Sequence, residues 1–142
     1  MLFFGHIAAS LLIADATGSD RGAAVAGNLL PDVVDKTGGW LLHVMPAGRW
    51  LAHGLPFFGA CSLLATCFLE PRRARGFILG YAGHLVCDHW AGGRIPWLAP
   101  FKSPRRQKPK RTARWWFVYL IPEAVGLPLT AHLLQRAQGA ED

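Results

Sequence analysis

The sequence predicts an all-α membrane protein, a compact helical bundle of four to five helices, some of them short or re-entrant. Hydrophobic residues make up 51% of the 142 residues and charged residues only 17%, whereas soluble domains carry about a quarter charged residues. The apolar runs are rich in Ala, Leu and Gly and show little strand-like alternation, which favours helices. Six Trp agree with a membrane interface. The length suits one domain, residues 1–142.

Two long apolar segments are the strongest candidates for membrane-spanning helices. Residues 50–69 contain no formal charge, and residues 115–135 contain Glu123 as their only one. Each segment has about the ~20 residues that a bilayer-crossing helix needs. We therefore expect both to cross the membrane, the second as the C-terminal helix.

Three shorter apolar segments complete the expected bundle. Residues 1–14 and 22–31 suit a pair of short helices or a re-entrant hairpin, which is tolerated where protein covers the backbone. The segment 76–91 approaches the length of a span only by including His84 and Asp88. Helix breakers separate the segments, in "DATGSDRG", "TGG", "EPRR" and "SPRR".

Basic residues are concentrated in the loop at 102–114, which holds seven of the 15 Lys and Arg residues. A nucleic-acid-binding arm is one interpretation, but the loop lacks interleaved aromatic residues and any recognition motif. It directly precedes the apolar "WWFVYL", which favours a loop facing anionic lipid headgroups, with no nucleic acid expected. Ten basic residues fall on this side of the expected trace and five on the other. We therefore expect this side to be the cytoplasmic face of an inner membrane.

The cysteines indicate neither a zinc motif nor a nucleophile. Cys61, Cys67 and Cys87 have no CxxC spacing and lie in apolar surroundings, so we interpret them as small buried hydrophobic residues. The sequence also lacks the G-x-S-x-G pattern of a serine nucleophile elbow.

Ionisable residues interrupt the apolar segments at positions that the expected trace brings to one side of the membrane. His6 lies near the start of the first helix, and His53 in the first turn of the helix from residue 50. His84 and Asp88, four residues apart, share one helix face. Two carboxylates are expected just after the second helix, in "NLLPDVVDK": Asp32 and Asp35.

Imidazole and carboxylate side chains together suit a divalent metal, because Zn²⁺, Mn²⁺ and Fe accept both ligands. A single His–Asp pair is more often an ordinary hydrogen bond, and Asp32 after a proline can cap a turn. The convergence of several such groups is what favours a metal site. We interpret His43 and His89 as lying outside it, and Glu123 as a hydrogen-bonding group within the bundle, with a site role as the alternative.

Four blocks of the sequence resemble the membrane-bound metal-dependent hydrolases, a family of small bacterial and archaeal inner-membrane proteins. The blocks cover residues 3 to 101 in family order and read "FFGHIAAS", "NLLPDVVDK", "GRWLAHGLPF" and "GYAGHLVCDHWAGGRIPWLAPF". They are similar to the family's Gly-His, L-P-D-x-x-D-K, Arg-x-x-x-His and G-x-x-x-H-x-x-x-D blocks. The residues after 101 carry little of the resemblance.

We expect one or two divalent ions, zinc first and manganese as the alternative. The resemblance implies two catalytic candidates beside the ligands, Asp35 and Arg49. Many members have His before the Arg, where this chain has Gly48, and Thr and Ser around the following His, so the number of ions stays open. The implied metal ligands are five: His6, Asp32, His53, His84 and Asp88.

These observations lead to an expected function and two alternatives. A metal-dependent hydrolase would act on a phosphate ester of a lipid or lipid-linked substrate at the cytoplasmic interface. The first alternative is a non-enzymatic membrane protein in which the metal or polar cluster only holds helices together. The second is a metal transporter, which the small number of helices and the lack of an inverted repeat disfavour.

Overall fold

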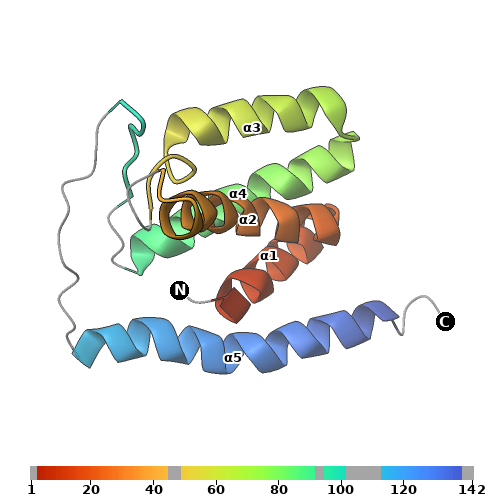
Figure 1. Cartoon of the computed structure of the whole chain (residues 1–142). Helices are drawn as coiled ribbons and strands as arrows, with labels where there is room; N and C mark the ends of the chain where they lie inside the picture. The colour runs from red at the N-terminus through yellow and green to blue at the C-terminus, as the bar shows by residue number, and fades with distance from the viewer. Residues whose placement is uncertain (1–2, 45–48, 92–94, 102–112, 139–142) are drawn as a thin grey trace.

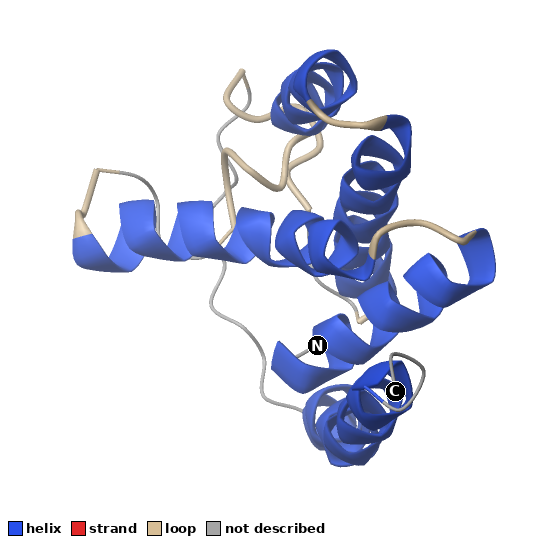
Figure 2. Ribbon diagram, turned by 90° about the vertical axis from the view of Figure 1, so that its right-hand side faces the viewer, coloured by secondary structure: helices blue, strands red, loops and turns tan. Residues whose placement is uncertain are grey.

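The fold is all-α, as predicted. The computed structural model describes residues 3–44, 49–91, 95–101 and 113–138, and within these it contains helices and loops but no strand (Figures 1 and 2). The basic residues from 102 to 112 lie outside the described residues. A π-helical turn at Thr37–Leu41 directly follows the second of five α-helices: α1 Phe3–Thr17, α2 Arg21–Lys36, α3 Leu55–Phe68, α4 Pro71–Trp90 and α5 Ala113–Gln138.

Helices α2 and α4 form the centre of the bundle, and their backbones touch. A Cβ atom at Gly80 of α4 would lie 2.0 Å from the carbonyl oxygen of Ala24 in α2. A Cβ atom at Gly27 of α2 would lie 2.1 Å from the carbonyl oxygen of Phe77 in α4. Only glycine permits so close an approach, so these two residues fix the spacing of the two helices.

The other helices cover this pair from different sides. Helix α1 packs on both α2 and α4, whereas α3 packs on α4 and α5 packs on α1. In Figure 1, α3 and α5 therefore lie on opposite sides of the bundle, with α1, α2 and α4 between them. Both outer helices leave a row of large apolar side chains exposed.

Among the described residues, no helix combines the length and the apolar character needed to cross a membrane. The crossings expected at 50–69, 76–91 and 115–135 are therefore not supported. Helix α3 is uncharged but has only 14 residues, which span about 21 Å at 1.5 Å per residue. Helix α4 has 20 residues but includes "PRRAR" in its first turns and Asp88 near its end. Helix α5 has 26 residues but includes Pro122, Pro128 and Glu123.

Several helix boundaries differ from the expectation, and two of the differences concern site residues. Helix α2 does not end at Pro31 but runs through it to Lys36, so Asp32 and Asp35 lie within the helix. Helix α3 begins at Leu55 rather than near residue 50, so His53 lies in the preceding loop. That loop is held by hydrogen bonds to Asp35, which replace helical ones.

The core beside this loop is built around Tyr81. Its ring is fully buried and meets Phe58 and Phe77 edge to face, with ring centroids 5.1 Å and 6.2 Å away. Its hydroxyl donates to the carbonyl oxygen of Ala52 at 2.5 Å. Helix α4 thereby anchors the loop that carries His53. The three cysteines were expected to be buried, but Cys67 is exposed and Cys61 and Cys87 are only half-buried.

Candidate metal centre

Helix α4 supplies two side chains of the centre from its C-terminal half. His84 and Asp88 are four residues apart and at most 1% exposed. His84 Nε2 lies 3.7 Å from Asp88 Oδ2. The expected common face is therefore the buried face of α4, where both side chains meet residues from α1, α2 and the loop before α3.

Asp35 of α2 holds the loop and orients His53. Its Oδ2 accepts hydrogen bonds from the Trp50 amide at 2.6 Å and from His53 Nδ1 at 2.7 Å. Its Oδ1 accepts from the Ala52 amide at 2.9 Å. With the proton on Nδ1, the ring presents the lone pair of Nε2, as in the carboxylate–histidine pairs behind many metal ligands. Asp35 therefore has the position of a group that supports a ligand.

The donor atoms around His53 Nε2 have the spacing of ligands to one ion. His84 Nε2 lies 3.2 Å away, Asp88 Oδ2 3.5 Å and Asp32 Oδ1 3.9 Å. Two nitrogens bound tetrahedrally to zinc at about 2.0–2.1 Å lie about 3.3 Å apart. Donor atoms of Asp32, His53 and His84 all fall within 4.8 Å of one another, close enough to hold a metal ion.

His6 of α1 joins the cluster from the other side of His84. The two imidazole rings stack, with centroids 4.3 Å apart and planes 16° apart. His6 Nε2 lies 3.6 Å from Asp88 Oδ1. The side chain is buried, and neither ring nitrogen has a hydrogen-bond partner among the described residues. A buried imidazole without partners is costly, and a metal would satisfy it. Donor atoms of His6, His84 and Asp88 also fall within 4.8 Å.

The centre reaches solvent at one edge, where Asp32 and Arg49 lie. The Asp32 side chain is 25% exposed, and its Oδ2 pairs with Lys36 Nζ at 2.6 Å. The Arg49 side chain is 27% exposed, and its Nε lies 2.5 Å from Asp88 Oδ2. A cation at the open edge of a histidine and carboxylate cluster suits an anionic substrate.

The pKa values of His84 and Asp88 favour their metal-binding forms. Burial, together with the neighbouring His6, lowers the pKa of His84 to about 3, so its ring is neutral near pH 7. Burial alone would raise the pKa of Asp88, but the neighbouring imidazoles of His53 and His6 and the charge of Arg49 lower it overall. Burial also opposes the charged form of His53, but the bond to Asp35 raises its pKa, which makes its nitrogen a stronger donor.

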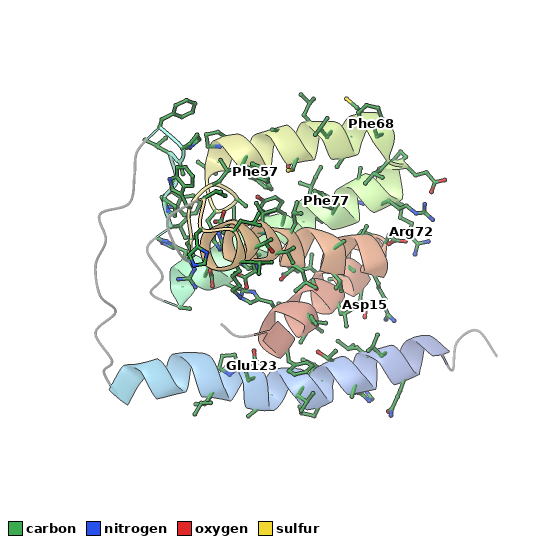
Figure 3. The ribbon with its side chains drawn as sticks, in the orientation of Figure 1. Asp15, Phe57, Phe68, Arg72, Phe77 and Glu123 are labelled. Carbon is green, nitrogen blue, oxygen red and sulfur yellow. The ribbon has the colours of Figure 1, made fainter. Side chains whose placement is uncertain are left out.

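The structure thus brings together all seven residues singled out from the sequence. His6, Asp32, His53, His84 and Asp88 line the cluster, Asp35 lies behind His53, and Arg49 lies at the edge. The opposite end of the bundle, where α4 begins, carries charged groups of its own, including Asp15 and Arg72 (Figure 3).

The residues expected outside the cluster lie outside it. His43 is exposed, in a left-handed backbone conformation with φ 54°. His89 is also exposed, and its ring lies 5.8 Å from that of Trp97. Glu123 of α5 is the expected hydrogen-bonding group, because it accepts from the amides of Phe4 and Gly5 at the start of α1.

Two buried polar residues on the helices that carry the cluster were not singled out in the sequence, Tyr81 and Asn28. Asn28 is fully buried on α2, and neither polar atom of its side chain has a hydrogen-bond partner among the described residues. A polar residue inside an apolar run, one helical turn before Asp32, is the feature of the sequence that could have singled it out. Tyr81 gave no signal, because a tyrosine in an apolar helix looks like any core residue.

Comparison with known proteins identifies the family of the chain. The family model described as "YdjM inner membrane protein" matches residues 1–141, and the chain therefore belongs to that family. The description names the inner membrane and no chemical activity. No curated protein and no solved structure matches the chain.

Proposed function

We propose that this member of the YdjM inner membrane protein family is a metal-dependent hydrolase that cleaves a phosphate ester of a lipid or lipid-linked substrate. The observation that carries the proposal is the cluster of buried donor atoms around His53 Nε2, with His84 Nε2 at 3.2 Å and Asp88 Oδ2 at 3.5 Å. When bound there, a divalent ion acidifies water and polarises a phosphoryl oxygen. Zinc fits the imidazole-rich donor set best, and manganese is the alternative.

The protein residues have separate roles in this proposal. His53, His84, Asp32 and Asp88 hold the ion, and Asp35 fixes the tautomer of His53 through the 2.7 Å hydrogen bond to Nδ1. Asp35 was a catalytic candidate in the sequence, but it is fully buried and accepts three hydrogen bonds. It is therefore a positioning residue.

Arg49 is the residue proposed to bind the substrate. Its guanidinium is partly exposed at the edge of the cluster and its Nε contacts Asp88 Oδ2, so it is aligned by the carboxylate. A guanidinium offers several donors in a fixed plane that match phosphate oxygens. Arg49 would hold the phosphate beside the ion and offset the negative charge that grows during hydrolysis.

The lipid nature of the substrate is supported by the membrane family and by the distribution of apolar and basic residues. Helices α3 and α5 expose large apolar side chains to their surroundings, among them Leu63, Phe68 and Val125. We propose that these faces contact membrane lipid, that the basic segment 102–114, which includes the start of α5, faces anionic headgroups, and that the cluster opens on the cytoplasmic side.

Metal content and turnover of purified variants test the proposed function. The wild-type protein should contain zinc or manganese and hydrolyse a member of a lipid phosphoesterase panel. A variant with His84→Ala and Asp88→Ala should lose both the metal and the activity while keeping its helical circular dichroism. Cys87→Ala is the matched control, because Cys87 lies between the two on α4 and is no part of the cluster.

Two outcomes of this experiment would contradict the proposal. Full metal content in the double variant would remove these residues from the site. The second outcome is a wild-type protein that holds metal but shows no turnover on any phosphate ester and unfolds when the metal is removed. The metal would then have a structural role only.

A further inference from the structure

We propose that the centre has a second metal position, between His6 Nε2 and Asp88 Oδ1, so that Asp88 bridges two divalent ions. This inference rests on the proposed function, because it takes the position around His53 as the first. It is drawn from Asp88, whose two carboxylate oxygens face different histidines.

Asp88 is placed to serve both positions at once. Its Oδ2 lies 3.5 Å from His53 Nε2 and 3.7 Å from His84 Nε2, on the side of the first position. Its Oδ1 lies 3.6 Å from His6 Nε2, on the other side. Paired metal ions about 3.5–4 Å apart are common in phosphate-ester hydrolases, where they hold the two reacting oxygens. A bridging carboxylate is a natural link between two such ions.

His6 is the residue that a single-ion site leaves unexplained. It is 2% exposed, both its nitrogens lack a hydrogen-bond partner among the described residues, and it stacks on His84. Because the two rings stack face to face, their nitrogens lie in two neighbouring planes, so each ring can donate to its own ion. With only His6 and Asp88 from the protein, the second ion would keep at least half of its ligand positions for water and for a substrate phosphate.

Helix α5 holds His6 in place for this role. Glu123 Oε2 accepts from the Phe4 amide at 3.0 Å, and Oε1 accepts from the Gly5 amide at 3.2 Å. Figure 3 shows Glu123 on the side of α5 that faces α1. A Cβ atom at Gly126 would lie 2.7 Å from the Gly5 nitrogen, so α5 fits closely against this turn. The carboxylate thereby fixes the backbone immediately before His6.

Metal stoichiometry tests the second position without any activity measurement. The wild-type protein, loaded with Mn²⁺ and freed of excess metal, should hold about two ions per chain, and His6→Ala about one. The wild-type electron paramagnetic resonance spectrum should be that of a magnetically coupled pair, and the His6→Ala spectrum that of an isolated ion. Glu123→Ala should weaken binding of the second ion and leave the first unchanged. His89→Ala, an exposed histidine on α4, is the control.

The possible results separate this inference from the proposed function. A wild-type protein with one ion and an uncoupled spectrum would overturn the second position while leaving the first. So would a folded His6→Ala variant that keeps two ions or loses both. His6→Gln, which keeps a polar side chain of similar length, replaces His6→Ala if that variant fails to fold. A wild-type protein that binds no Mn²⁺ and no Zn²⁺ would overturn both proposals.

Discussion

Asp35 is the residue on which the geometry of His53 depends most. Its carboxylate accepts three hydrogen bonds, two from loop amides and one from the imidazole. Asp35→Asn keeps the shape of the side chain but puts an NH₂ group where one of the oxygens accepts. We expect metal affinity to fall by about 10–100-fold, the usual effect of losing a group that orients a ligand. Competition with a chelator of known affinity measures it.

Asp15→Asn is the matched control for this change. Asp15 is exposed and pairs with Arg21 at 2.6 Å, at the end of the bundle away from the cluster. Surface ion pairs contribute about 0–1 kcal/mol, so metal affinity should not change. Equal losses in the two variants would show that the effect of Asp35→Asn is not specific to His53.

At the residue scale, the sequence was informative where spacing alone brings groups together. His84 and Asp88 lie on the same helix, so their meeting follows from helical geometry. The role of Asp35 was not predictable, because its hydrogen-bond partners lie 15 to 18 residues further along the chain. The hydrogen bond that the Phe4 amide donates to Glu123 joins residues 119 positions apart. Such contacts depend on how the helices pack, which no local pattern records.

At the scale of elements, the contact of α2 with α4 sets the distances within the cluster. Gly80→Ala would place a Cβ atom 2.0 Å from the carbonyl oxygen of Ala24. The helices would have to separate, and we expect a loss of about 1–3 kcal/mol in the free energy of unfolding, typical of overpacking. Weaker metal binding should accompany it, because α2 carries Asp32 and α4 carries His84. Thermal unfolding in detergent measures the stability.

Gly59→Ala provides the control within a helix. Gly59 lies on the exposed face of α3, and a Cβ atom there would meet nothing within 4 Å. Alanine should stabilise the helix by about 0.5–1 kcal/mol relative to glycine. If Gly80→Ala proved as stable as Gly59→Ala, the close approach of α2 and α4 would be wrong.

The helices themselves were predictable, but several of their ends were not, among them the two that place site residues. Pro31 suggested an end to α2, because proline removes an amide donor and disfavours the preceding helical turn. The helix continues because the residues beyond Pro31 form further contacts: Asp32 pairs with Lys36 one turn later and Asp35 binds the loop before α3. The apolar character of residues 50–54 likewise suggested helix, but the buried carboxylate of Asp35 holds them as a loop.

At the scale of the molecule, the exposed apolar side chains are the feature that needs a partner. On α3, Leu63 is 64% exposed, Leu64 56% and Phe68 81%. A variant with all three changed to Ser should bind membranes at least about tenfold more weakly, since burying each such side chain contributes about 1.5–3 kcal/mol. Flotation with vesicles of inner-membrane lipid composition measures the bound fraction.

The neighbouring polar turn provides the control for this surface. Changing Glu70, Arg72 and Arg73 to Ser alters three residues next to α3, all of them exposed. Because these side chains are charged, their loss should leave the apolar contact with lipid intact. A triple variant of α3 that floats as well as the wild-type protein would show that this face does not contact the membrane.

The hydrogen bonds from the start of α1 to Glu123 also have a consequence for the order of assembly during translation. The ribosome completes α1 early, but Glu123 follows Phe4 by 119 residues. At about 5–20 residues per second, the partner of this turn is synthesised about 6–24 s later. Until then the amides of Phe4 and Gly5 lack this acceptor, and the turn that carries His6 lacks its support from α5. Under the proposal of a second metal position, stable metal uptake by His6 would therefore be a late event in the biogenesis of the protein, after most of the bundle has been made.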